Sequence, residues 1–85
     1  MKNYIAVFYE YDSALRFSRK CADEGIKAGI IPVPKRLNPY CKYGVKFEES
    51  DSFVYYGDPY GEVEQIVRIN ANKFEEIYSA EDDDN

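Results

Sequence analysis

The sequence predicts a single small α+β domain, and two observations carry that prediction. Residues 4–9 are apolar on both alternating faces, which is typical of a strand in the middle of a sheet. A second strand, over 28–33, contains Pro32. Because proline has no N–H to donate to a neighbouring strand, it favours the edge of a sheet. Eighty-five residues, 45% of them hydrophobic, suffice for one folded domain.

The elements between and after these strands follow in order. A helix is predicted over 13–24, because apolar residues recur there at helical spacing. Asp12 or Ser13 suits its N-cap, and Gly25 suits the residue that ends it. The next two predicted elements are a loop rich in proline and asparagine and a third strand of clean alternation, over 34–43 and 44–48.

The second half of the chain leaves two interpretations. Residues 62–70 place apolar side chains on one face of a short helix, which is the interpretation we favour, and 74–78 then form the last strand. Alternatively, 53–56 and 63–69 form a β-hairpin, and residues 74–78 belong to a C-terminal helix.

The favoured interpretation gives the order β-α-β-β-α-β, which is the ferredoxin-like arrangement. It has an antiparallel sheet of strand order 4-1-3-2 with both helices on one face. That order puts the first strand inside and the second at an edge, as their residues require. We expect one domain over 1–80, followed by a flexible acidic tail over 81–85.

The composition excludes several classes of function. With no His and only two Cys, the chain offers neither a structural zinc site nor a disulfide framework. We therefore expect no metal, no cofactor and a reducing, cytoplasmic location. No apolar run reaches the roughly 18–20 residues of a membrane span. A Ser/His/Asp arrangement cannot exist without His, and no phosphate-binding loop is present, so we do not expect an enzyme.

Charge is distributed unevenly along the chain, whose net charge is −5. Residues 1–45 carry eight Lys/Arg and four Asp/Glu, whereas residues 46–85 carry three and twelve. The negative total disfavours nucleic acid as a partner.

The two cysteines differ in their sequence surroundings. Cys21 lies on the apolar stripe of the predicted helix, where a buried thiol is expected. Cys41 lies in the loop, near Lys35, Arg36 and Lys42, at the end of the domain where the helix begins. Cations and a helix N-terminus lower a thiol pKa, so we predict that Cys41 is a carrier or redox thiol. Because Cys21 lies about 12 Å further along the helix axis, we expect no disulfide between the two.

The stretch 34–47 resembles the signature of the selenium/sulfur carrier-like family: a proline, a basic residue, a polar loop, a cysteine and a strand. The resemblance covers residues 3–47. It implies a small α+β domain whose thiol handles reactive selenium or sulfur, and it transfers a role to Cys41 alone. Lys42 stands where the family has glycine, and residues 50–61 look like an insertion.

The chain has nine tyrosines and no tryptophan, which is more tyrosine than so small a core can bury. Because tyrosine is enriched at protein interfaces, some of these residues are candidates for contact with a partner. The candidates are Tyr4, Tyr43, Tyr55, Tyr56 and Tyr60.

Two functions from different classes remain open. The first is a small non-enzymatic thiol protein that acts through Cys41 and passes its cargo to a protein partner. The second is an acidic, tyrosine-rich protein-binding module or inhibitor, of the kind by which phages imitate nucleic acid, in which the thiol has no role. A homodimer through the open face of the sheet is a further expectation.

Overall fold

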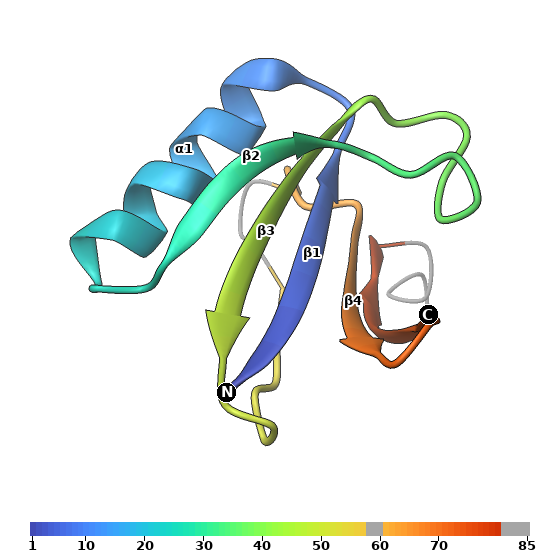
Figure 1. The fold of residues 1–85 in the computed structure, drawn as a ribbon. Coiled ribbons are helices and arrows are strands. Elements are labelled where there is room, and N and C mark those ends of the chain that lie inside the picture. The colour runs from blue at the N-terminus through green and yellow to red at the C-terminus, as the bar shows by residue number, and fades with distance from the viewer. Residues whose placement is uncertain (58–60, 81–85) are drawn as a thin grey trace.

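The computed structural model describes residues 1–57 and 61–80 (Figure 1). The predicted acidic tail and Tyr60 lie outside the described residues. Within them, the chain forms one helix and five strands: β1 (Lys2–Phe8), α1 (Tyr11–Asp23), β2 (Ala28–Pro32), β3 (Tyr43–Glu49), β4 (Gln65–Asn70) and β5 (Lys73–Ser79).

The five strands form one antiparallel sheet in the order β2-β3-β1-β4-β5. The central strand, β1, pairs with β3 on one side and β4 on the other, so that Tyr4 lies between Phe47 and Arg68. All five residues from Tyr4 to Phe8 are buried. The predictions of a central first strand and of an edge strand containing Pro32 are confirmed.

The predicted ferredoxin-like fold is wrong, because the described residues contain one helix rather than two. The segment expected to be the second helix contains β4, which turns at Ala71 (φ 55°) into β5. Adjacent Ile66 and Val67 are buried on opposite faces of the sheet, which is a strand pattern. The spacing of apolar residues in this segment is compatible with a helix and with a strand. The segment forms a strand because it pairs with the free edge of β1.

The alternative hairpin is also wrong, because β4 pairs with β5 and not with residues 53–56. Residues 74–78 do form part of a strand, as favoured, but this strand lies beside β4 at the sheet edge.

Helix α1 begins at Tyr11, two residues earlier than predicted, with Glu10 at its N-cap and no side-chain cap. The predicted capping by Asp12 or Ser13 is therefore wrong. The end of the helix is as predicted: Gly25 has a φ of 76°, a left-handed conformation that glycine adopts at no steric cost. In the described part of the chain, no helix has the length and apolar character that crossing a membrane requires.

The sheet has a core on each face. The helix face, under α1, holds the larger core, which consists of Tyr4, Ala6, Phe8, Ala14, Cys21, Val45, Phe47, Val63 and Ile66. The opposite face is covered by the connection between β2 and β3, residues 33–42, which we call the thiol loop. Its core consists of Ile5, Val7, Val33, Cys41 and Val67. Figure 1 shows this loop extending from the end of β2 towards β4 and β5, away from α1.

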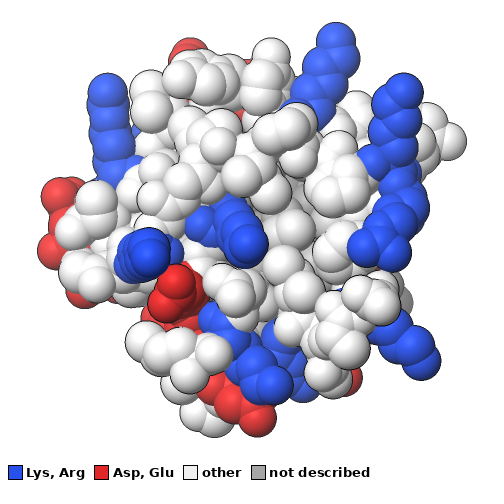
Figure 2. All heavy atoms as spheres, viewed as in Figure 1, with Lys and Arg blue, Asp and Glu red and all other residues white. Residues whose placement is uncertain are grey.

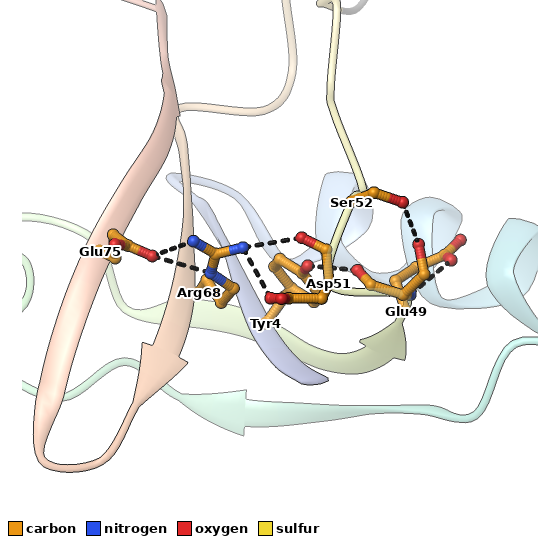
Figure 3. Close-up of polar contacts among 7 residues, drawn as sticks. Tyr4, Glu49, Asp51, Ser52, Arg68 and Glu75 are labelled. Carbon is orange, nitrogen blue, oxygen red and sulfur yellow. Dashed lines mark hydrogen bonds and ion pairs between the residues drawn. The ribbon is translucent and has the colours of Figure 1, made fainter. Parts of the chain in front are cut away.

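A polar network fixes the chain where it leaves β3 (Figure 3). The hydroxyl of buried Tyr4 donates a hydrogen bond to the carbonyl oxygen of Ser50. Arg68, on β4, donates to the carbonyl and carboxylate oxygens of Asp51, at 2.8 and 2.9 Å, and also pairs with Glu75 on β5. The network ties the segment after β3 to the β4–β5 hairpin.

Candidate functional site

The thiol loop is held in shape by its own hydrogen bonds. The Oδ1 atom of Asn38 accepts the backbone N–H groups of Tyr40 and Cys41, at 2.9 and 3.2 Å. At the base of the loop, the N–H of Val33 donates to the carbonyl of Lys42 at 3.3 Å. This arrangement follows from the local sequence, since an asparagine side chain readily bonds the backbone two and three residues on. It places Cys41 near the end of the loop, two residues before β3.

Cys41 is buried, with 4% of its surface exposed. Burial raises the pKa of its thiol, and the carboxylate of Glu64 raises it further. A hydrogen bond from the side chain of Tyr9 lowers the pKa but does not outweigh burial. The direction is opposite to the one predicted, because the loop covers the thiol.

The lysine and arginine side chains that were expected to lower the pKa of the Cys41 thiol do not contribute to its shift. Lys35, Arg36 and Lys42 are all exposed, and the charge that shifts the pKa of Cys41 is that of Glu64. Arg36 lies with its guanidinium carbon 4.6 Å from the centre of the Phe74 ring. Figure 2 shows lysine and arginine side chains spread widely over the face seen in Figure 1, rather than gathered at one point.

A polar pocket of about 260 Å³ lies beside the buried thiol. Tyr9 and Glu64, the two residues that act on the thiol of Cys41, both line it. Its other lining residues are Leu37, Asn38, Pro39, Tyr40, Gln65, Glu76 and Ser79. The pocket therefore lies between the loop and the β4–β5 hairpin, next to the residues that act on the thiol, while Cys41 itself does not line it.

Sequence reasoning missed both Tyr9 and Glu64 as site residues. Tyr9 directly follows the central strand, and this position could have indicated that it lies near the site. Glu64 directly precedes β4 and could not be placed while that segment was interpreted as a helix.

Cys21 occupies a different environment, on the helix face. It is 6% exposed, as its place on the apolar stripe predicts. Burial, Glu24 and Glu49 raise its pKa to about 11. Both cysteines are free thiols, in agreement with the expectation that they form no disulfide.

A larger groove, of about 730 Å³, runs beside α1. Cys21 and the aromatic side chains of Phe17, Phe53 and Tyr55 are among the residues that line it. Its rim carries both signs of charge, contributed by Arg16, Lys20, Glu24, Glu49 and Glu62. This groove was not predicted from the sequence.

The candidate interface tyrosines are not brought together. Tyr4 is fully buried and stacked on Phe47, so its ring offers no surface to a partner. Tyr43 and Tyr55 are half-buried, the latter against Tyr78. Tyr56 is 92% exposed.

Basic and acidic residues are equal in number within the part of the chain that the structure describes. The described residues carry eleven Lys/Arg and eleven Asp/Glu, so the net charge of −5 comes from residues outside the described ranges. In those ranges, no group of three His, Cys, Asp or Glu side chains is placed to hold a metal ion.

These features define a small α+β protein with a buried loop thiol next to a polar pocket. The chain belongs to the family described as "Putative Se/S carrier protein-like", whose model matches residues 3–79. The match confirms the resemblance seen over residues 3–47 and extends it through β5. No curated protein and no solved structure matches the chain.

Proposed function

We propose that the protein is a non-enzymatic carrier in which Cys41 holds sulfur or selenium for transfer to a protein partner in a reducing cytoplasm. One observation carries the proposal: the side chain of Tyr9, which lines the polar pocket, forms a hydrogen bond with the Cys41 thiol. Because a hydroxyl that donates to sulfur stabilises its anionic form, Tyr9 favours both the attacking thiolate and the persulfide anion. Membership of the Se/S carrier-like family supports the choice of cargo.

The loading step balances as a simple exchange. The Cys41 thiolate attacks the outer sulfur of a donor persulfide, R–S–SH, and a new S–S bond forms at Cys41. The S–S bond of the donor breaks, and the donor leaves as the thiolate R–S⁻. No further oxidant or reductant is needed.

Mass spectrometry of the intact protein tests the proposal. After incubation with glutathione persulfide, we expect a gain of about 32 Da, one sulfur atom, in the wild type and in Cys21→Ser. Cys41→Ser should gain no mass while it keeps the same circular dichroism spectrum. A gain that persists in Cys41→Ser and disappears in Cys21→Ser would overturn the proposal, as would the absence of any gain in the wild type.

A second candidate function, a protein-binding module, is supported by Tyr56. This residue is 92% exposed and directly follows Tyr55, which lines the groove beside α1. Large exposed aromatic side chains are typical anchors of protein interfaces. If this function is the correct one, Tyr56→Ser weakens partner binding and Cys41→Ser does not. Tyr40→Ser serves as the control, because Tyr40 is 80% exposed and lines the polar pocket rather than the groove beside α1.

A further inference from the structure

Besides the apolar packing of Val33, Leu37 and Cys41 on the sheet, two polar attachments hold the thiol loop. At its base, the backbone bond from Val33 to Lys42 continues the pairing of β2 with β3. At its far side, Arg36 contacts the β4–β5 hairpin: its guanidinium lies 4.6 Å from the ring centre of Phe74, and its Nη1 donates to the carbonyl of Asn72 at 3.3 Å. The loop therefore bridges two hairpins that are separated by β1.

The two attachments differ in strength. The base is part of a paired sheet, whereas the Arg36 contact consists of one cation–π interaction and one hydrogen bond at an exposed side chain. Opening of the loop at the Arg36 side breaks this contact and the packing of Leu37 on the core, but it leaves the pairing of β2 with β3 intact.

Opening is also what the chemistry of Cys41 requires. Attack on a persulfide needs the sulfur to approach the donor in line with the breaking S–S bond, and a side chain that is 4% exposed allows no such approach. Leu37 packs against the core that contains Cys41, and Leu37 and Asn38 both line the polar pocket.

We propose that Arg36, held by Phe74 and Asn72, is a latch that keeps the thiol loop closed over Cys41. Release of the latch lets the loop lift from the hairpin and opens the pocket onto the sulfur. The biological meaning of the latch rests on the proposed carrier function, but its control of access to the thiol does not. This gives Arg36 a mechanical role in place of the electrostatic one that its position in the sequence suggested.

Alkylation kinetics test the latch. In a Cys21→Ser background, the rate of Cys41 modification by iodoacetamide is measured for Arg36→Ala, Phe74→Leu and Lys35→Ala. Loss of about 1 kcal/mol from the closed state raises the rate about fivefold in the first two variants. Lys35→Ala removes the same charge from the neighbouring residue and should change the rate less than twofold. The double variant Arg36→Ala/Phe74→Leu should be no faster than the faster single variant, because both remove the same contact.

Cys21 serves as the control for global unfolding, because it lies on the other face of the sheet. In a Cys41→Ser background, Arg36→Ala should leave the alkylation rate of Cys21 unchanged. Equal acceleration of both cysteines would overturn the latch, as would equal rates for Arg36→Ala and Lys35→Ala.

The outcomes also separate the latch from the carrier function. If Arg36→Ala accelerates alkylation but Cys41 never takes up sulfur from a persulfide, the latch holds and the carrier function fails. If Cys41 takes up sulfur, and Arg36→Ala changes neither the rate of this uptake nor the rate of Cys41 alkylation, the carrier function holds and the latch fails.

Discussion

Cys21 and Cys41 lie on opposite faces of the same β-sheet. Cys21 packs with Tyr4, Ala6 and Phe8, the residues of β1 that face α1, whereas Cys41 packs with Ile5 and Val7, which face the thiol loop. The alternation of side chains along one strand thus separates the two thiols, with the backbone of the sheet between them. The two cysteines can be modified, oxidised and titrated independently of each other.

The first prediction concerns the hydrogen bond to Cys41. Tyr9→Phe removes the one interaction that lowers the pKa of this thiol, so its pKa should rise further above its ordinary value of 9.0. In a Cys21→Ser background, the alkylation rate at about pH 8 should fall about three- to tenfold, since a pKa rise of one unit is a tenfold loss of thiolate. The measurement is the rate of alkylation as a function of pH.

Tyr11→Phe is the matched control, because Tyr11 packs on Tyr43 and is not among the groups that shift this pKa. Identical pH profiles for the two variants would contradict the prediction.

The second prediction concerns stability at high pH. The pKa of Cys21 is about 11 in the folded protein, against 9.0 for a solvated thiol, so the native state holds this proton more tightly than the unfolded state. The stabilisation is complete below about pH 9 and is lost as the pH rises towards 11. Urea unfolding of wild type and Cys21→Ala at about pH 8 and about pH 10.5 measures it. The wild type should lose more stability over this interval than Cys21→Ala, since only the wild type has this thiol. Equal losses would mean that Cys21 does not titrate in this range.

The third prediction concerns Gly44, which lies under the thiol loop at the start of β3. A Cβ added at this position would lie 3.2 Å from Val33 Cγ2 and 3.3 Å from Ile5 Cγ2. Gly44→Ala should therefore cost about 1–3 kcal/mol of unfolding free energy and raise the alkylation rate of Cys41, because overpacking pushes the base of the loop away from the sheet. The control is Gly29→Ala on neighbouring β2, where an added Cβ meets nothing within 4 Å. Equal stability of the two variants, measured by urea unfolding, would show that the contact with Val33 relaxes freely.

The fourth prediction concerns Arg68, which joins the segment after β3 to the β4–β5 hairpin. Arg68→Ala should lower the free energy of unfolding, because it breaks the hydrogen bonds to Asp51 and the ion pair with Glu75 together. Arg68→Lys should restore less than half of the loss, since an ammonium group cannot bind both partners in a planar fork. Thermal or urea unfolding measures both effects.

The control for Arg68 is Lys73→Ala, at an exposed position of β5. We expect it to change stability by less than about 0.5 kcal/mol. If Arg68→Ala were equally mild, the network drawn in Figure 3 would contribute nothing net to stability.

The first half of the fold could be predicted from the sequence because its signals are local. The two-sided apolar pattern of β1, Pro32 in β2 and Gly25 after α1 each restrict the backbone or its position in the sheet directly. The second half could not be predicted, because Val63, Ile66 and Val67 fit one face of a helix as well as they fit a strand. What makes this segment a strand is β1, about sixty residues away in sequence.

The site shows the same division between local and non-local information. The loop position of Cys41 and the buried position of Cys21 follow from the sequence around each. The burial of Cys41 does not, because it depends on contact of Arg36 and Leu37 with a hairpin that was not foreseen. Once that contact exists, desolvation outweighs any nearby cation, and the direction of the pKa shift reverses.

The central position of β1 has a consequence for how the protein is made. This strand leaves the ribosome before both of its partners, since β3 and β4 follow about forty and about sixty residues later. A nascent chain that ends after β3 therefore exposes one unpaired edge of an apolar strand, which invites both chaperone binding and aggregation. Non-local pairing of this kind also slows folding, and the exposed edge of β1 is covered only after β4, which follows β3 in the chain, has been synthesised.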